Sequence, residues 1–387
     1  MASNTITKVI PKILAQGMMV LRQNCVAPRL VANMTSSIAG KRGSTIDVPV
    51  PSAITATDVT PAATAPVAGA LNPDSVPVVL DKWKEAAFDL SDSEFEQVMD
   101  GTIPMQAEEA IKAICNAVDT SILALYVQFF GFHGTAGTTP FANVDTGVSD
   151  AVGIRKVLNN NLAPMDPRNV ILNPDAEANA LSMKQFADMT FSGSVAAMRD
   201  GQLNRKLGMD WWMNQNVPVH VRNALGAGAL TVNGVNAAAA TTVSIAKGAG
   251  ANWSAKKGDL ITIAHGGATG TKQYVVNADV TVVQGTNTNV TIYPGLVVAT
   301  VGAEAVTSID THTVNLAFHR DAIAFANRPL LTVPEGLGSL SLSQVDPVSG
   351  LALRIEVTRE FKRTRWSYDF LWGCAVPRRE LGARLLG

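Results

Sequence analysis

The sequence is poor in charge, and the shortage is uneven along the chain. Charged side chains make up 16% of the 387 residues, below the usual quarter, which suggests that neighbouring molecules cover much of the surface. The formal net charge of −1 argues against a dedicated nucleic-acid binder, because such proteins are normally strongly basic. Acids are absent before Asp47, and arginine is absent between Leu225 and Thr311.

Metal-binding and catalytic motifs are also missing. The three cysteines lie far apart and form no CxxC pair, so neither a zinc site nor a redox motif is expected. The sequence contains no HExxH, GxSxG, Walker or EF-hand motif. Its one tight polar cluster, His319-Arg320-Asp321, is better explained as a strand-to-helix junction, with Asp321 capping the helix, than as an acid–base pair. We therefore expect no enzyme activity, no metal and no cofactor.

Long hydrophobic runs are absent as well. The start, MASNTITKVIPK, has no signal-peptide core. The longest apolar run lies near Ile122–Phe132, contains Gln128, and is too short to span a bilayer. The sequence thus predicts a soluble protein with no membrane partner.

The first 46 residues combine an amphipathic helix with basic side chains. Apolar residues recur at helical spacing from Ile10 to Leu21. Docking of this helix on the protein's own core and docking on an acidic partner are both open. Six basic residues precede the first acid: Lys8, Lys12, Arg22, Arg29, Lys41 and Arg42.

A long hairpin follows the basic arm. Ser44–Val50 and Ser75–Leu80 read as short extended runs joined by about twenty residues of Ala, Thr, Pro and Val. So long a tip has too little apolar surface to offset its ordering entropy. We expect another surface to order it, most simply another copy of the chain.

The rest alternates helices and strands. Apolar spacing predicts a helical spine from about Pro104 to Phe130, roughly 40 Å long at 1.5 Å per residue. Further helices are expected at 149–162 and 174–187, and two long antiparallel strands within Leu351–Trp372. Residues 225–311 instead show short strands separated by Gly, Asn and Asp turns, which predicts an inserted small barrel or sandwich.

An arginine cluster marks the two C-terminal strands. These side chains form a solvated face, pair across the strands with acids of the same chain such as Glu356 and Glu360, or form salt bridges to another subunit. Together with the basic arm and Asp47 they make up the candidate inter-subunit contacts: Lys8, Lys12, Arg22, Arg29, Lys41, Arg42, Asp47, Arg359, Arg363 and Arg365.

The order of these segments resembles the major capsid proteins of tailed bacteriophages, the HK-ninety-seven-type fold. It is most similar to coat proteins of short-tailed phages like the Salmonella phage P-twenty-two, which carry an inserted immunoglobulin-like domain. The insert shows no residue-level match to that phage's domain. The resemblance is carried by these segments in order: TITKVIPKILAQGMMVLRQN, GKRGSTIDVPVP, Leu158–Pro174, Met198–Gly201, Leu207–Asp210, Asn214–Pro218, Asn315–Leu330, Ser349–Leu353, Tyr368–Gly373 and Val376–Glu380.

The resemblance implies an α+β phage major-capsid fold with an inserted all-β, immunoglobulin-like domain. It implies a homo-oligomeric shell of pentamers and hexamers, assembled in a host bacterial cytoplasm with a scaffolding protein and a portal protein. The virion capsid would then enclose double-stranded DNA. The implied parts are an N-terminal arm (1–43), an E-loop hairpin (44–81), a P-domain (82–146, completed by about 351–372), an A-domain (147–224), the insert (225–311) and the return (312–387).

Three rival functions remain open from the residues. An encapsulin-like nanocompartment would share the fold class but carry a docking groove for a cargo peptide. A surface adhesin would use the insert to bind glycans, and an enzyme would need a site assembled from distant residues.

Overall fold

The computed structural model divides into two compact units. One contains residues 1–24, 33–115 and 323–377, and the other contains residues 25–32, 116–322 and 378–387. The residues that the structure describes are 14–15, 17–19, 21, 25–34, 40–51, 56, 58–59, 61, 74–92, 102–143, 147–188, 196–266, 270–332, 339–346 and 350–387.

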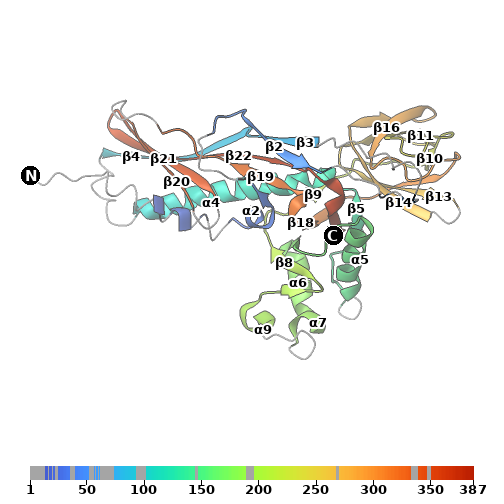
Figure 1. Ribbon diagram of the computed structural model, residues 1–387, viewed down its shortest axis with the longest axis horizontal. Coiled ribbons are helices and arrows are strands. Elements are labelled where there is room, and N and C mark those ends of the chain that lie inside the picture. The colour runs from blue at the N-terminus through green and yellow to red at the C-terminus, as the bar shows by residue number, and fades with distance from the viewer. Residues whose placement is uncertain are drawn as a thin grey trace, which may run out of the picture. The chain divides into compact units, whose positions relative to one another are not determined.

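The first unit is built on an antiparallel sheet in the order β1-β19-β22-β21-β20 (Figure 1). Strand β4 also pairs with β22, from Arg363 to Trp372, and β19 pairs with the end of β22 that follows. The two long strands expected within Leu351–Trp372 are confirmed as β21 and β22, joined by a tight turn. The strands are β1 (Ala32–Asn33), β4 (Lys82–Ser91), β19 (Ala324–Asn327), β20 (Ser339–Val345), β21 (Ala352–Glu360) and β22 (Arg363–Ala375).

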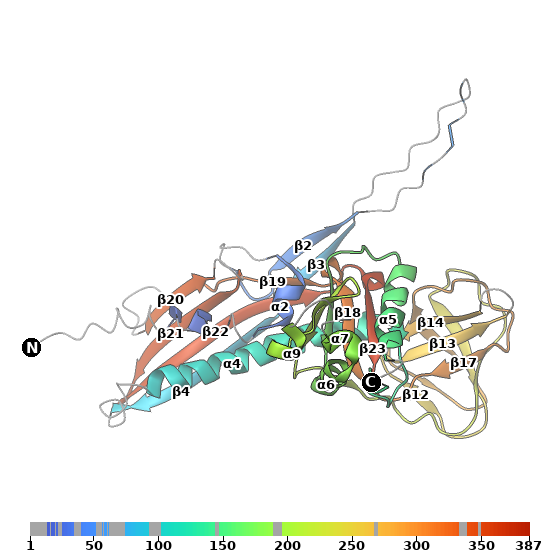
Figure 2. The ribbon, with the colours of Figure 1, turned by 90° about the horizontal axis from the view of Figure 1, so that it is seen from below.

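The predicted hairpin has its base packed on this sheet. Strands β2 (Thr45–Val50) and β3 (Asp74–Val79) pair from Thr45↔Val79 to Val50↔Asp74, and Figure 2 shows them beside β19. Val48, Val78 and Leu80 are buried in one apolar cluster with side chains of β19 and β22. Most of the segment between the strands lies outside the described residues.

A buried asparagine holds the centre of this sheet together. Asn327 is fully buried; its amide group donates to the Leu371 carbonyl over 2.8 Å, and its side-chain oxygen accepts the Ala352 N–H. Because each buried polar group left without a partner costs about 1–3 kcal/mol, this one side chain stabilises three strand segments.

Replacing Asn327 by Ala is expected to lower the free energy of unfolding by about 3 kcal/mol, because a buried N–H and a carbonyl lose their partner. Asn289→Ala, at an exposed position of another strand, is the matched control and should change stability by less than about 0.5 kcal/mol. Urea unfolding followed by circular dichroism measures both. Equal effects of the two substitutions would contradict the role of Asn327.

The helical spine is shorter than expected. Helix α4 (Thr102–Leu123) is followed by a 3-10 turn, η2 (Ala124–Gln128), in place of a single helix to Phe130. At 1.5 Å per residue, 22 residues give roughly 33 Å. The stretch Ala107–Gln128 is long and apolar enough to cross a membrane by length and composition. Ile111, Val118 and Ile122 are buried in protein, and 39% of the most apolar part of this stretch is buried.

The second unit contains a sheet in the order β5-β23-β18-β6-β8-β7, with β9 pairing β18. Its elements are α2 (Ala27–Leu30), β5 (Gly131–His133), α5 (Val148–Asn160), β6 (Arg168–Leu172), α6 (Pro174–Ser182), α7 (Lys184–Ala187), α9 (Ala196–Asp200), β7 (Asn204–Lys206), β8 (Met209–Met213), β9 (Val219–His220), β18 (His312–His319), η4 (Arg320–Ala322), η5 (Arg379–Leu381) and β23 (Gly382–Leu386).

Two local predictions in these regions were wrong. The single helix expected at 174–187 is two helices, because Met183 leaves helical geometry with a ψ of 131°. Residues 319–325 do not run from strand to helix: β18 leads through the short turn η4 into another strand, β19. The backbone N–H of Asp321 donates to Nδ1 of His319, so the polar cluster closes a strand-to-strand turn.

The inserted segment is a closed antiparallel barrel in the order β10-β11-β16-β14-β13-β17. Sequence analysis left barrel and sandwich open, and the resemblance implied an immunoglobulin-like sandwich; the closed barrel corrects the latter, because an immunoglobulin fold is two separate sheets. The core includes Trp253, Tyr274 and Ile245. The strands are β10 (Leu230–Val232), β11 (Thr242–Lys247), β12 (Trp253–Ala255), β13 (Leu260–His265), β14 (Gly270–Val276), β15 (Val280–Val282), β16 (Asn287–Tyr293) and β17 (Ala305–Ser308).

Candidate inter-subunit surfaces

The basic residues of the arm are only partly within the described chain. Lys8, Lys12 and Arg22 lie outside the described residues. Arg29, in α2, is exposed.

The remaining early candidates lie at the hairpin. Lys41, Arg42 and Asp47 are all exposed. Nε of Arg42 donates to the Asp81 carbonyl over 3.2 Å, and the Lys41 carbonyl accepts from the Ser44 hydroxyl over 2.7 Å. Lys41 and Arg42 therefore lie in the turn that precedes β2, and the side chain of Asp47 in β2 is exposed to solvent.

The arginine cluster is paired with acids of its own chain. Nη2 of Arg365 lies 2.8 Å from Oε1 of Glu85, on the neighbouring strand β4. Nη1 of Arg359 lies 2.6 Å from Oδ1 of Asp92, and Arg363 pairs with both Glu360 and Asp89. All three arginines thus pair with acids of their own chain, although Asp92, the partner of Arg359, lies just beyond the end of β4. Contact with a second subunit stays a prediction.

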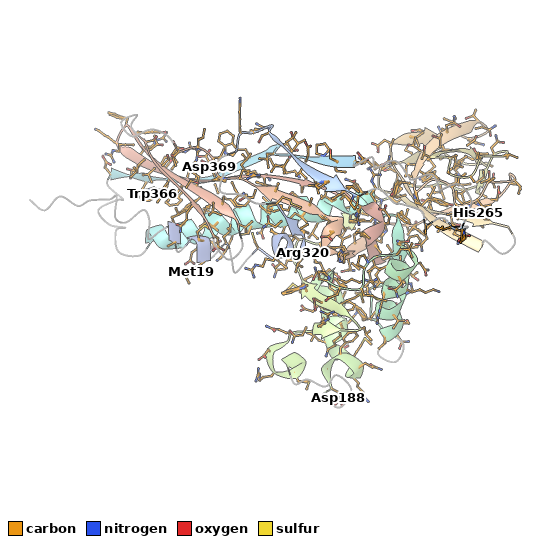
Figure 3. All side chains as sticks on the ribbon, in the orientation of Figure 1. Met19, Asp188, His265, Arg320, Trp366 and Asp369 are labelled. Atoms are coloured by element: carbon orange, nitrogen blue, oxygen red, sulfur yellow. The ribbon has the colours of Figure 1, made fainter. Side chains whose placement is uncertain are left out.

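A buried ion pair in the same sheet had no signal in the sequence analysis. Arg354 donates through Nε and Nη2 to Oδ2 of Asp369, at 3.0 and 2.6 Å. The indole N–H of Trp83 donates to the other carboxylate oxygen over 3.2 Å. Figure 3 labels Asp369 and Trp366 on this sheet. Arg354 and Asp369 face each other in the β21–β22 register, which alternation of apolar and polar residues alone did not reveal.

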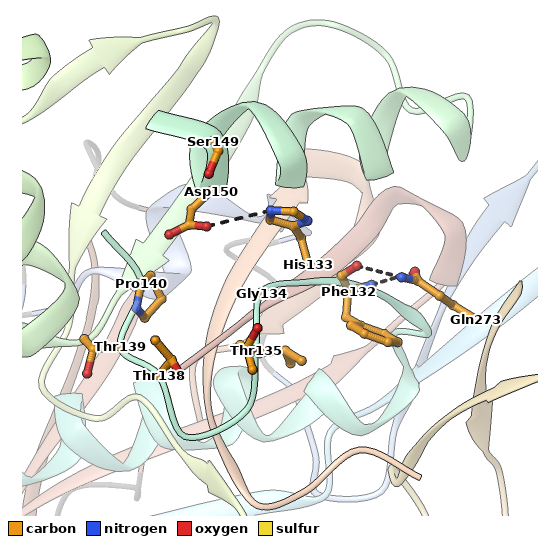
Figure 4. Close-up of a pocket in the computed structure, with 11 residues that line it drawn as sticks. Phe132, His133, Gly134, Thr135, Thr138, Thr139, Pro140, Ser149, Asp150 and Gln273 are labelled. Carbon is orange, nitrogen blue, oxygen red and sulfur yellow. Dashed lines mark hydrogen bonds and ion pairs between the residues drawn. The ribbon is translucent and has the colours of Figure 1, made fainter. Parts of the chain in front are cut away.

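A polar pocket of about 380 Å³ lies in the second unit between β5, the loop after it and the start of α5. Figure 4 shows Asp150 pointing toward His133, with Nε2 and Oδ1 3.8 Å apart. Asp150 also accepts the Phe141 N–H over 2.9 Å, and the His133 ring fills the space that a side chain at position 153 would need. These contacts fix the loop to the helix. Among the described residues, no hydrogen bond joins Ser149 to His133.

A second groove, of about 490 Å³, lies beside β7 and β8. Trp212 and Met213 line it and are 43% and 36% exposed, whereas Trp211 is buried. The ring of Trp212 therefore faces the groove, whereas that of Trp211 belongs to the core.

Within the described residues, no group of three or more His, Cys, Asp or Glu side chains is placed to hold a metal ion. None of the three cysteines forms a disulfide, and Cys115 is buried in the apolar stripe of α4.

No family model matches the chain. No curated protein matches it either.

Solved structures do match over most of the chain. A capsid chain of the cyanophage P-SCSP1u has a TM-score of 0.51 at 11% identity, and the match covers 94% of this chain and 88% of that chain. A chain of Mycobacterium phage Che8 has a TM-score of 0.48 at 14% identity, covering 89% and 84%. A capsid chain of an empty GTA particle has a TM-score of 0.47 at 9% identity, covering 95% and 89%.

The match to the cyanophage capsid structure establishes the fold. The chain has the phage major-capsid fold, a mixed α+β architecture, as the resemblance in the sequence implied. The comparisons do not support a specific likeness of the barrel to the insert of the P-twenty-two group.

Proposed function

We propose that the chain is the major capsid protein of a tailed bacteriophage, a structural and non-enzymatic subunit that assembles into an icosahedral shell around packaged DNA. The observation that carries the proposal is the match of 94% of the chain to a cyanophage capsid subunit. The long hairpin and the scarcity of charge agree with it, because a shell subunit has most of its surface covered by copies of itself.

The parts of the chain take the following roles in this proposal. Residues 1–43 form the N-terminal arm, 44–81 the E-loop and 82–146 the P-domain, which residues 351–372 complete. Residues 147–224 form the first part of the A-domain, and residues 312–387 return to the A-domain and the P-domain. Repeated heterologous contacts between such subunits close into rings of five and six. A scaffolding protein and a portal protein are the proposed partners during assembly in the host cytoplasm.

Electron microscopy tests the proposal. The protein is expressed with the products of its neighbouring genes, sedimented through sucrose and imaged in negative stain. Closed shells of uniform size are expected, with scaffold and portal proteins copurifying. Small oligomers under every condition would contradict the proposal, and shells filled with a cellular enzyme would favour a nanocompartment instead.

The arginine cluster gives a sharper test of how subunits meet. Arg365→Glu breaks the pair with Glu85, but stability should change by less than about 1 kcal/mol because the pair is exposed. The double variant Glu85→Arg/Arg365→Glu restores an ion pair within the chain. We expect the double variant to assemble like the wild type, measured by sedimentation of shells.

The control is the single variant Glu85→Arg. It carries the same arginine at position 85 as the double variant but has no acid at position 365 to pair with it. If the double variant stays unassembled while its melting temperature is normal, Arg365 contacts an acid of another subunit, and the intra-chain pair is not its main role.

A further inference from the structure

The inserted barrel is joined to the rest of the second unit by an extensive junction. Phe132 and Leu386, outside the insert, form one apolar cluster with Leu260 and Val275 of the barrel. The side chain of Gln273 pairs with the backbone of Phe132, accepting its N–H over 3.0 Å and donating to its carbonyl over 2.8 Å. The barrel is therefore held by contacts well beyond the two chain connections.

The centre of the junction is a fully buried arginine. Nη1 of Arg384, in β23, donates to the Gly258 carbonyl of the barrel over 2.8 Å, and its guanidinium lies 5.0 Å from the centre of the Tyr126 ring. Gly258 has a φ of +99° and lies against Val127, where a Cβ would come within 2.9 Å. Only glycine fits this turn comfortably, because of both its backbone angle and the close approach.

A hydrogen-bonded chain runs beside this arginine. Nε2 of His220 lies 2.7 Å from Oδ1 of Asp259 in the barrel, and Nδ1 lies 3.0 Å from the Tyr126 hydroxyl. Asp259 is fully buried and also accepts the Lys256 N–H over 3.0 Å. His220 thus connects η2 to the turn that precedes β13.

A second histidine packs on the first. His312 pairs with His220 in the short β9–β18 ladder, and the two ring centres lie 5.3 Å apart. Nδ1 of His312 lies 2.7 Å from the Asp310 carbonyl, so it must carry the proton, because a carbonyl can only accept. Nε2 is buried with no hydrogen-bond partner among the described residues. A protonated ring would place a charged N–H there without an acceptor.

We propose that His312 is a pH-sensitive lock on the inserted barrel: its neutral ring fits the closed junction, and its protonated ring opens it. Opening breaks two contacts between the barrel and the rest of the unit: that of Asp259 with His220 and that of Gly258 with Arg384. The proposal does not depend on shell formation, because every residue in it belongs to one chain.

The groups around His312 set the direction of the effect. Burial is the largest influence and lowers its pKa to about 4. Arg384 of β23 and His220 of β9 lower it further, while the Asp310 carbonyl and Asp259 of the barrel raise it. Arg222 faces this site indirectly, through its ion pair with Asp310.

The sign follows from proton linkage. A released His312 has an ordinary pKa near 6.5, so the open junction binds more protons than the closed one. The stabilisation of the closed state is complete above pH 6.5 and is lost as the pH falls toward 4. Between pH 8 and pH 5, the equilibrium constant for opening should rise roughly 30-fold.

Hydrogen–deuterium exchange of the full-length, unassembled chain tests the lock. Wild type and His312→Gln are compared at the same pH, so the intrinsic pH dependence of exchange cancels. Peptides covering 219–224, 256–265 and 311–318 should lose protection in the wild type at pH 5 and keep it in His312→Gln. Parallel loss in both proteins would overturn the proposal.

His319→Gln is the matched control. His319 is also buried and on β18, but it bonds the Asp166 carbonyl and not the barrel, so this variant should open like the wild type. His265, whose pKa burial also lowers, lies inside the barrel on Tyr274; its protonation would loosen β13 and β14 rather than the 219–224 peptide.

A direct titration keeps the test decisive if His312→Gln fails to fold. The wild type is labelled with ¹³C-histidine and the ring resonance of His312 is followed with pH. The lock predicts that it titrates well below the ordinary value and together with loss of junction protection. A normal titration near pH 6.5 with an intact junction would overturn it.

Discussion

Subunits in which residues 51–73 are replaced by an Asn-Gly turn are expected to fold normally and form no shells. Val50 and Asp74 face each other in the β2–β3 register, so a two-residue turn can join them without disturbing the pairing. The buried contacts of Val48, Val78 and Leu80 are all retained. The variant therefore removes the segment between the two strands and leaves the paired base of the hairpin intact.

Sedimentation and electron microscopy measure the assembly, and thermal unfolding measures the fold. Val78→Ala is the contrasting variant: it keeps the tip but removes a fully buried side chain at the base, and should cost about 2–3 kcal/mol of stability. Normal shells from the shortened hairpin would show that the tip makes no essential contact between subunits.

Excision of residues 225–311, closed with a short glycine linker, is expected to leave a folded but clearly weakened subunit. The β9–β18 pairing of Val219 with Thr313 can persist as the base of a new hairpin. Phe132 and Leu386, however, lose the apolar cover of the barrel, and Arg384 loses the Gly258 carbonyl. We expect a loss of about 3 kcal/mol or more, from the newly exposed apolar surface and from the lost hydrogen bond of Arg384.

Thermal unfolding and binding of a hydrophobic dye measure this effect. Adding Phe132→Thr and Leu386→Thr to the excised chain should reduce dye binding, because these are the newly exposed side chains. An unchanged melting temperature after excision would show that the barrel does not stabilise the rest of the second unit. Complete insolubility of both excised chains would make the barrel part of the folding core.

Periodicity predicted much of the fold because local burial repeats along these elements. The apolar stripe of α4 and the alternation in β21 and β22 each follow one buried face. The barrel was harder, since short strands with turns between them fit either a closed or an open architecture. The strand β19 was missed because its four residues are all buried, so no alternation marks it.

The junction could not be predicted because its parts come from distant segments. Tyr126, His220, Asp259, His312 and Arg384 meet only through tertiary packing, and along the sequence the histidines look scattered. For the arginine cluster, the sequence left open whether the partners are acids of the same chain or of another subunit, and it did not identify the acids in and just after β4. Glu85, Asp89 and Asp92 become neighbours of the cluster only once β4 pairs with β22.

The strand order of the two sheets also has a consequence for the timing of biosynthesis. In one sheet β22 lies between β4 and β21, and in the other β23 lies between β5 and β18. These two inner strands are made after all their partners, so a ribosome-bound chain lacks the middle of both sheets until residues 363–386 have emerged. The barrel strands, by contrast, all lie between residues 230 and 308, so the barrel can close before either sheet is complete, and the order of synthesis separates the folding of the barrel from that of the two sheets.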